Sequence, residues 1–261
     1  MSDRVRYSVA DGVARVVLDA PERLNAVDPA MLDAVAGYVE TAGEEPGVRV
    51  VAVTGSGRGF CSGANLAGPS VGSGADAGVV EDGTLLGVSR VARALVGCPR
   101  PTVALVNGVA AGAGASMALA CDYVLATASA SFVLAFARIG LMPDGGATAL
   151  VAANVGRARA MRMALTGEAV PAAVAAEWGL VAECVPDEDF GRRSEELLVR
   201  LAAFSPGAAA ETKAAINGAT LDLEAALAVE ERGQTRLLGS ADLREGVAAF
   251  LEKRPPVFRG E

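Results

Sequence analysis

Hydrophobic positions in the first two thirds of the chain fall into short β-branched runs separated by longer stretches of mixed polarity. Residues 5–9 and 13–18 flank Asp11 and Gly12, a pair that supplies the positive φ angles of a tight turn, so they predict a β-hairpin. Residues 48–54 form a continuous apolar run, which is typical of a strand buried on both faces. The alternation of such strands with helical stretches predicts an α/β architecture.

Helix signals follow the same order along the chain. Asp28 suits a helix N-cap and Pro29 suits the first helical position, so they predict a helix that extends to about Thr41. Further helices are predicted at 84–97, from Gly145 onward and at 157–165, and further strands at 102–106, 122–127 and 131–135. From about residue 190 only helices are predicted, at 190–203, 207–217, 222–238 and 240–253. This change predicts a core of residues 1–190 and a helical region of residues 191–261.

Two glycine-rich segments follow predicted strands, at residues 60–66 and 107–116. The second segment opens an alanine-rich helix that extends from Ala113 to Ala120. Glycine lets the backbone approach a ligand closely, and the N–H groups of a helix's first turn have no partner within the helix. Two such segments could direct two backbone N–H groups at one oxygen, which would form an oxyanion hole without any side chain.

Residues 67–83 are rich in Gly, Ser, Ala and Asp and show no hydrophobic periodicity. We interpret them as a mobile loop over the site, and the alternative is a disordered insertion.

The composition of the chain limits the kinds of core, partner and location that are possible. Hydrophobic residues make up 52% of the 261 residues and aromatic residues only 4%, so the core must consist mostly of Ala, Val and Leu. The net charge of −8 argues against a nucleic-acid surface. No apolar run approaches the length of a membrane span, and the N-terminus lacks the apolar segment of a signal peptide. We therefore expect a cytoplasmic protein with no membrane partner.

The chain contains no histidine, which excludes Ser-His-Asp and Cys-His catalysis. Proton transfer must then use carboxylates, Lys, Tyr, Cys or water. Cys61, Cys98, Cys121 and Cys184 show neither paired spacing nor neighbouring ligand residues, so we expect neither a disulfide nor a metal site.

In their order and spacing, five segments of the chain resemble the sequence pattern of the crotonase family, also called the enoyl-CoA hydratase/isomerase family. These segments are residues 23–26, 60–66, 107–122, 136–148 and 250–258. The resemblance implies a spiral of ββα units with a C-terminal helical trimerisation region. It also implies an acyl-CoA thioester substrate, no cofactor apart from the CoA of that substrate, and a homotrimer or a dimer of trimers.

The resemblance also assigns positions in the site. The oxyanion donors of the family match the backbone N–H groups of Ala64 and Ala113. Arg23 resembles the basic residue that meets a CoA phosphate, and Phe250 and Lys253 resemble the pair that reaches the adenosine end. The positions that line adenine and pantetheine are matched by Ala26, Ser62, Ala64 and Leu66.

The chain departs from the family's hydratases at both catalytic glutamates, which are replaced by Ser116 and Phe136. We expect both residues to contact the acyl group, but neither can transfer a proton as a carboxylate does. Asp144 lies where several isomerases of the family place their base. An apolar pocket would raise the pKa of such a carboxylate toward a useful range. The alternative for Asp144 is a helix N-cap for the segment that begins at Gly145.

One carboxylate suffices for a 1,3-proton shift, so the sequence favours an enoyl-CoA isomerase with Asp144 as acid and base. Two alternatives stay open. The first is a hydratase with atypical catalytic residues, in which Asp144 or Ser116 orders the water. The second is an acyl-CoA-binding protein without chemistry.

Overall fold

The computed structural model of the protein describes residues 2–65 and 83–260. Its strands are β1 (Val5–Ala10), β2 (Val13–Leu18), β3 (Val50–Gly55), β4 (Gly59–Cys61), β5 (Thr102–Val106), β6 (Val109–Ala111), β7 (Tyr123–Thr127), β8 (Ser131–Val133), β9 (Ala169–Pro171) and β10 (Glu183–Val185). Its α-helices are α1 (Pro29–Glu44), α2 (Gly83–Gly97), α3 (Ala113–Leu119), α4 (Ala147–Thr166), α5 (Ala172–Trp178), α6 (Phe190–Ala202), α7 (Pro206–Thr220), α8 (Leu223–Leu238) and α9 (Ala241–Glu252). Short 3-10 helices are η1 (Pro21–Arg23), η2 (Ala135–Ile139) and η3 (Asp187–Asp189).

The strands form two sheets. The larger has the order β1-β2-β3-β5-β7-β10, and it is parallel except for the β1–β2 hairpin. Asp11 and Gly12 have φ angles of 52° and 78° in the hairpin turn, which confirms the predicted hairpin. The smaller sheet has the order β4-β6-β8-β9, and only β9 pairs antiparallel in it.

Three consecutive units build the core, namely β3-β4-α2, β5-β6-α3 and β7-β8-α4. Each unit supplies one strand to each sheet and then a helix, so the ββα spiral implied by the resemblance is present. The sequence analysis did not predict β4 and β6, which overlap the two glycine-rich segments. Strands of three residues are too short to show a periodicity of two in the sequence.

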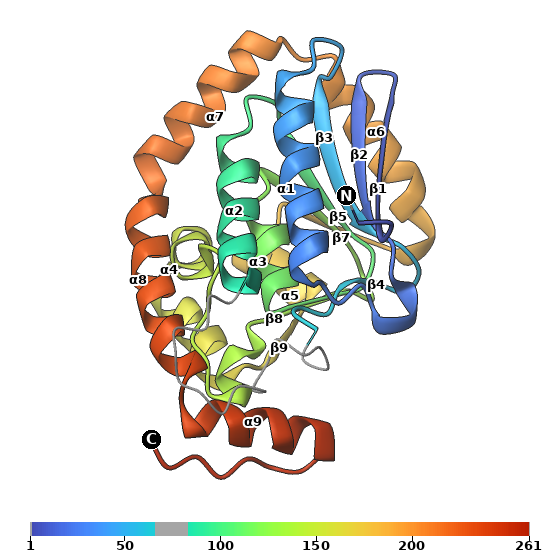
Figure 1. Cartoon of the computed structure of the whole chain (residues 1–261). Helices are drawn as coiled ribbons and strands as arrows, with labels where there is room; N and C mark the ends of the chain where they lie inside the picture. Colours follow the sequence, from blue (N-terminus) through green and yellow to red (C-terminus); the bar gives the residue numbers. More distant parts are fainter. Residues whose placement is uncertain (1, 66–82, 261) are drawn as a thin grey trace.

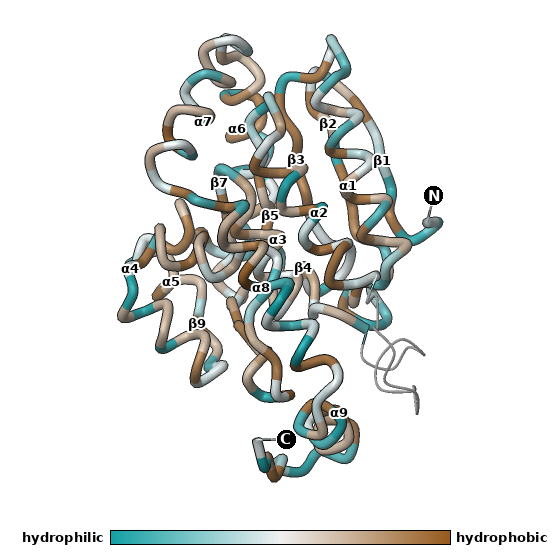
Figure 2. The backbone as a smooth tube through the Cα atoms, turned by 60° about the vertical axis from the view of Figure 1, so that its left-hand side comes forward, coloured by the Kyte–Doolittle hydropathy of each residue, from teal (hydrophilic) through white to brown (hydrophobic). Residues whose placement is uncertain are grey.

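Both faces of the large sheet are covered, and the strand predicted at 48–54 is buried on both of them, although it begins at Val50. Val51 and Val53 belong to the main core with α1, α2 and α3, and Figure 1 shows α1 and α2 side by side over this sheet. Val50 and Ala52 belong to a second cluster with α6. Figure 2 shows hydrophobic backbone along the central strands and hydrophilic stretches on the outer helices.

The helices predicted after residue 190 are confirmed with small shifts at their ends. Helix α6 packs on the large sheet through Leu197 and Leu198, which are fully buried. Helix α7 is tied to the core by Lys213, whose Nζ lies 2.9 Å from Asp122 Oδ2. In Figure 1, α7 and α8 follow one side of the molecule, and α9 lies at the far end beside the C-terminus.

Helix α4 contains the break that the sequence predicts between two helices. Gly156 has φ 74° and ψ 165° inside it, which separates residues 147–155 from residues 157–166. The first helix begins at Ala147 rather than Gly145, because Gly145 and Gly146 have φ angles of 64° and 79°. These left-handed conformations turn the chain sharply just after Asp144.

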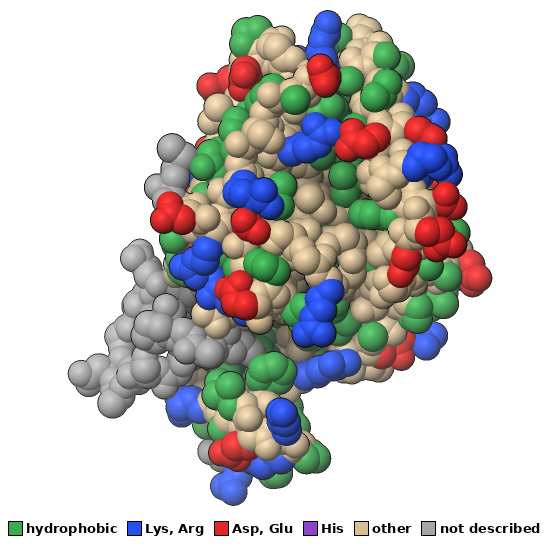
Figure 3. Space-filling view, turned by 90° about the vertical axis from the view of Figure 1, so that its right-hand side faces the viewer, with side chains coloured by type: hydrophobic (Ala, Val, Ile, Leu, Met, Phe, Trp, Pro, Cys, Tyr) green, Lys and Arg blue, Asp and Glu red, His purple; other side chains and the backbone are tan. Residues whose placement is uncertain are grey.

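The surface is mixed in charge on the face drawn in Figure 3, where Lys and Arg side chains alternate with Asp and Glu. Within the residues that the structure describes, no helix is both long enough and apolar enough to span a lipid bilayer.

Candidate active site

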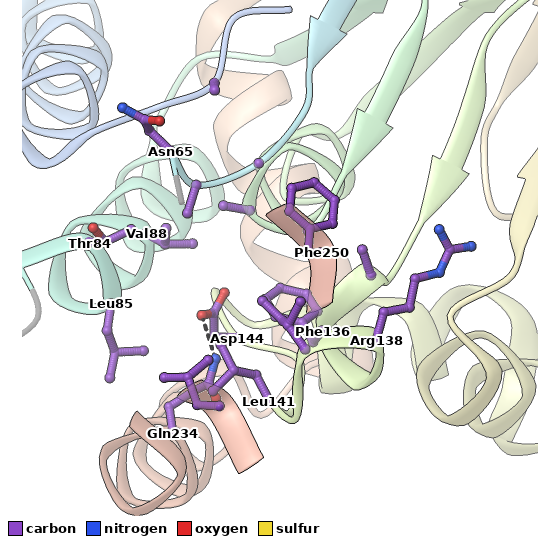
Figure 4. Close-up of a pocket in the computed structure, with 18 of the residues that line it drawn as sticks. Asn65, Thr84, Leu85, Val88, Phe136, Arg138, Leu141, Asp144, Gln234 and Phe250 are labelled. Atoms are coloured by element: carbon purple, nitrogen blue, oxygen red, sulfur yellow. Dashed lines mark hydrogen bonds between the residues drawn. The ribbon is translucent and has the colours of Figure 1, made fainter. Parts of the chain in front are cut away.

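A cavity of about 360 Å³ lies between the ends of β4 and β6, the start of α2, η2 and the two last helices. Its walls are mainly apolar, with Leu85 and Val88 on α2 and Leu243 on α9 among the lining residues. In Figure 4 the carboxylate of Asp144 lies at the centre, with Leu85 and Val88 on one side and Phe136 and Phe250 on the other.

The structure brings most of the predicted site residues to this one cavity, although they come from distant parts of the chain. The predicted residues that line it are Ala26, Ser62, Ala64, Ala113, Phe136, Asp144 and Phe250. Leu66 and the predicted loop at 67–83 lie outside the described residues, except for Gly83, which begins α2.

Three predicted residues do not line the cavity. Arg23 pairs with Asp28 at 3.4 Å instead, because both side chains belong to the short loop that precedes α1. Lys253 is the exposed, left-handed C-cap of α9. Ser116 is fully buried, and its hydroxyl donates to the Asp144 carbonyl oxygen at 2.8 Å. A contact of Ser116 with the acyl group therefore disagrees with the structure, in which Ser116 holds the backbone beneath the cavity.

The two residues predicted to supply the oxyanion donors, Ala64 and Ala113, line the same cavity. In the parallel bridge between Val27 and Ala64, the Val27 N–H donates to Gly63 O at 2.8 Å and Val27 O accepts from Asn65 N at 2.9 Å. Successive N–H groups of an extended chain point to opposite sides, so the Ala64 N–H points away from Val27. Ala113 is the first residue of α3, where the N–H has no partner within the helix.

Close backbone packing brings these two amides together. A Cβ on Gly63 would lie 2.9 Å from the Ala111 carbonyl oxygen and 3.7 Å from the Ala113 nitrogen. Gly63 also has a φ of 99°, which side chains disfavour. A Cβ on Gly114 would lie 2.3 Å from Cys61 O. Glycine is therefore required at both positions, and the reason is the approach of β4 to the start of α3.

The buried side chain of Asn25 holds the loop before α1 against β4, a role that the sequence analysis did not assign. Its Oδ1 accepts from Ala20 N at 2.9 Å, and its Nδ2 donates to Ser56 O at 2.9 Å and to Gly59 O at 2.8 Å. Asn25 adopts a φ of 57°, which Asn tolerates better than most residues. These bonds position Ala26 at the cavity.

Asp144 is 8% exposed, and its Oδ2 accepts a hydrogen bond from Gln234 Nε2 at 2.9 Å. The alternative of a helix N-cap is wrong, because the N-cap position of α4 is Gly146, which has no side-chain cap. Glu230 on α8 satisfies this helix start instead. It accepts from Gly146 N at 2.7 Å and from Thr148 N at 2.9 Å.

Glu230 is fully buried, and burial raises the pKa of its carboxyl above the ordinary value although hydrogen bonds from Thr148 and Gly146 act in the opposite direction. The sequence analysis missed both Glu230 and Gln234. Their spacing of four residues places them on one face of a helix, and this spacing is a sequence signal that the two side chains act in the same region. The sequence does not reveal that this polar face packs inward.

Phe136 forms an apolar wall where the family's hydratases carry a glutamate. It is 7% exposed, and its Cζ would lie 3.9 Å from a Cβ on Gly112. The ring therefore lies close to the start of α3. Arg138, two residues later, also lines the cavity, but Figure 4 shows its guanidinium pointing away from Asp144.

The cysteines are free, and Cys61, Cys98 and Cys121 are buried. Burial raises the pKa of Cys61 to about 12, so this thiol stays protonated at neutral pH. The described part of the chain contains no group of three or more Cys, Asp and Glu side chains placed to hold a metal ion.

The fold and the cavity define a protein of the crotonase class. The family model described as enoyl-CoA hydratase/isomerase matches residues 8–261, and the chain belongs to this family.

Named relatives divide between two reactions. The chain is 45% identical to the "Probable enoyl-CoA hydratase" of Rhodobacter capsulatus, over 98% of both chains. It is 40% identical to the 1,2-epoxyphenylacetyl-CoA isomerase of Escherichia coli, over 100% of both. A crystal structure of an enoyl-CoA hydratase from Mycobacterium avium subsp. paratuberculosis matches with a TM-score of 0.91 and 44% identity, over 98% of both chains. The family is thus established, and the reaction must be argued from the site.

Proposed function

We propose that the protein is an enoyl-CoA isomerase that moves the double bond of a 3-enoyl-CoA thioester, with Asp144 as acid and base. One observation carries the proposal. Among the described residues that line the cavity, Asp144 is the only carboxylate. The positions of the two hydratase glutamates hold Ser116, which lies beneath the cavity, and Phe136, which is apolar.

The reaction needs one proton acceptor and one oxygen site. The Asp144 carboxylate removes a proton from C2 of the substrate, and the electrons of the C–H bond form a C1=C2 bond while the thioester oxygen becomes an oxyanion. Asp144 then returns the proton at C4, the thioester carbonyl re-forms, and a C2=C3 double bond results. The step moves one proton within the substrate and is balanced without a redox cofactor.

The N–H groups of Ala64 and Ala113 are the oxyanion donors in this proposal. Donors of this kind contribute about 3–4 kcal/mol each to transition-state stabilisation in other enzymes. Ala26 and Ser62 line the cavity together with Ala64, and Phe250 lines it from α9. These residues are the proposed acyl-CoA contacts. The contact of Arg23 with a CoA phosphate and the contact of Lys253 with the adenosine end stay predictions.

Hydration is the second candidate, because the Rhodobacter relative is named a probable enoyl-CoA hydratase. Addition of water requires a group that activates the water and a group that protonates C2. Asp144 would have to serve both purposes if only the described residues that line the cavity take part. Binding of an acyl-CoA without turnover is the third outcome that an experiment must distinguish.

The test follows both reactions in isotopically labelled water. The protein is incubated with 3-enoyl-CoA in deuterium oxide and with 2-enoyl-CoA in ¹⁸O-water, and products are followed by NMR and mass spectrometry. We expect conversion of the 3-enoyl to the 2-enoyl isomer without uptake of ¹⁸O. Uptake of ¹⁸O would establish hydration and contradict the proposal. The epoxide named for the Escherichia coli relative is a third substrate to assay.

Asp144→Asn is the decisive variant. It should lower kcat by roughly 10²–10⁴-fold, as loss of a general base does, while substrate affinity measured by calorimetry changes little. The matched control is Asp189→Asn, because Asp189 lies at the surface and pairs only with Arg192 among the described residues. Equal turnover in Asp144→Asn and in the control would exclude Asp144 as the base.

A further inference from the structure

Gln234 on α8 reaches the Asp144 carboxylate from ninety positions further along the chain. Its side chain is 2% exposed, so the amide is removed from solvent. Nε2 donates to Asp144 Oδ2 at 2.9 Å, and Oε1 accepts from Met142 N at 3.3 Å. The bond to Asp144 is drawn in Figure 4.

The second bond determines which way the amide faces. A backbone N–H can only donate, so the group of Gln234 that meets Met142 must be the carbonyl oxygen. The NH₂ group is therefore the one directed at Asp144. Gln234 presents a fixed donor to the carboxylate, whereas a rotating hydroxyl could either donate or accept.

Two neighbours on α8 hold Gln234 in this position. A Cβ on Gly233 would lie 2.1 Å from Met142 Sδ, so α8 packs directly against the Met142 side chain, which would have to shift to admit a larger residue. Glu230, one turn earlier, bonds Gly146 and Thr148 just after Asp144. Side chains of α8 therefore bond the backbone both before and after Asp144.

We propose that Gln234 is a positioning residue for the reaction: its amide holds Asp144 Oδ2 and so directs the carboxylate at the reacting carbons of the substrate. The inference rests on the proposed function of Asp144. A hydrogen bond from a neutral donor is stronger to a charged carboxylate than to a protonated one. Gln234 therefore also keeps Asp144 ionised as the proton acceptor in an apolar cavity.

Charged groups of several described residues lie on the elements around Asp144. Glu230 on α8 is engaged at the start of α4, and Arg138 lines the cavity from η2. On α2, Arg90 pairs with Asp33 and Glu40, and Arg93 pairs with Glu224 and Glu231. Because the Gln234 amide donates to the Asp144 carboxylate and such a bond favours the charged form, loss of this donor should be visible in the pH dependence of the reaction.

The experiment compares Gln234→Met, a near-isostere without polar atoms, with Gln234→Glu, which places a second carboxyl beside Asp144. We expect kcat of Gln234→Met to fall roughly 10- to 100-fold, as misplacement of a catalytic group does, with KM within about twofold because uniform binding is kept. The acidic limb of the kcat/KM profile should move to higher pH, since the carboxylate loses a bond that favours its charged form. The shift should be larger in Gln234→Glu.

Asn217→Leu is the control. Asn217 donates to Val96 O near the C-terminal end of α2, and it does not line the cavity, which lies at the start of that helix. If Gln234 had a purely structural role, Gln234→Met and Gln234→Glu would have lower melting temperatures, and their pH profiles would stay at the wild-type position. That result would overturn the proposal.

A second measurement separates this inference from the proposed function. In protein labelled with ¹³C at aspartate carboxyl carbons, the Asp144 signal is identified by its loss in Asp144→Asn. It should titrate at higher pH in Gln234→Met than in wild type, even if the wild-type protein isomerises no 3-enoyl-CoA. Identical titration in the two proteins would contradict the inference, whereas absence of isomerisation alone would contradict only the proposed function.

Discussion

Individual buried amides organise the site of this protein. Asn25 binds three backbone groups from η1 to β4, and Gln234 binds one backbone amide and one carboxylate. Each side chain uses donor and acceptor together, which an apolar or a charged side chain of the same size cannot do. The geometry of the candidate site therefore depends on residues to which the proposed function gives no chemical step.

Asn25→Leu should destabilise the fold by about 2–4 kcal/mol, because buried backbone groups at Ala20, Ser56 and Gly59 would lose their partner. The measurement is urea unfolding, in which the midpoint should fall. Asn154→Ala is the control, since the Asn154 side chain makes no hydrogen bond with a described residue, and it should unfold like wild type. A midpoint of Asn25→Leu equal to that of the control would refute the assigned role.

Between helices, α8 supplies the cap of α4, because a side chain of α8 accepts hydrogen bonds from the first backbone N–H groups of α4. The start of α4 has no cap of its own, and Glu230 supplies the acceptors from a helix that follows it by more than fifty residues. A carboxylate at a helix start is favourable, and its complete burial is unfavourable for the charged form. These opposing effects make stability depend on pH.

Replacement of Glu230 by Gln removes one acceptor oxygen and should destabilise the protein at every pH. Burial raises the folded-state pKa of Glu230 above the ordinary value of 4.5, so its stabilising contribution is complete below about that pH and declines as pH rises through the folded-state pKa. The difference in unfolding free energy between wild type and Glu230→Gln should therefore shrink as pH rises from 4.5. Denaturant titrations at several pH values measure it, and a difference that grows with pH would contradict the sign.

Helix α9 packs closely against η2 at Gly246. A Cβ on Gly246 would lie 2.6 Å from the Cα and the carbonyl carbon of Ile139. Gly246→Ala must therefore push α9 outward, at a cost of about 1–3 kcal/mol for overpacking. Because Leu243 and Phe250 of α9 line the cavity, KM for the CoA substrate should rise roughly tenfold or more.

The control for this variant is Gly191→Ala, since a Cβ there meets no atom within 4 Å among the described residues. It should leave KM unchanged and should not lower the melting temperature, because alanine favours the helix over glycine. An unchanged KM in Gly246→Ala, with a lowered melting temperature, would show that α9 stabilises the fold without shaping the cavity.

Apolar side chains remain exposed on the last helices and the C-terminal segment of the single chain, among them Phe250, Leu251, Val257 and Phe258 at 61%, 57%, 66% and 40%. Clusters of this kind mark interaction surfaces. We propose that they pack between copies of the chain in a trimer or a dimer of trimers. Light scattering after size exclusion should then give three or six times the chain mass of 26.2 kDa.

A variant tests which surface assembles. Val257→Ser with Phe258→Ser removes apolar area outside the cavity lining and should shift the mass toward smaller species. Arg259→Ser is the neighbouring control and should not. A monomeric wild type at micromolar concentration would exclude the proposed assembly.

Local patterns identified most elements of the fold but missed several of the short strands. The hairpin turn at Asp11 and Gly12, the cap at Asp28 and the helices after residue 190 were predicted correctly, since turn geometry, capping and helical periodicity act between near neighbours. Strands β4 and β6 were missed, because pairing between distant segments stabilises them and three residues carry no periodicity.

For the candidate site too, some residues could be predicted from the sequence and others could not. The order and spacing of the glycine-rich segments and of Asp144 led from sequence alone to one family and one cavity. Gln234, Glu230 and Asn25 were not assigned, and Ser116 was placed in the cavity when it lies beneath it. Such roles depend on which face of a helix packs inward, and that is settled by contacts between segments that the sequence separates.

By itself, then, the sequence determined the family, the absence of imidazole chemistry and the loss of both hydratase glutamates, because residue identity and local spacing suffice for these conclusions. Only the tertiary structure decided which groups meet. It brought Asp144 and Gln234 to 2.9 Å, left Arg23 paired with Asp28, and gave the cap of α4 to Glu230. Hydrogen bonds require approach within about 3 Å, and that approach is a property of packed helices and sheets.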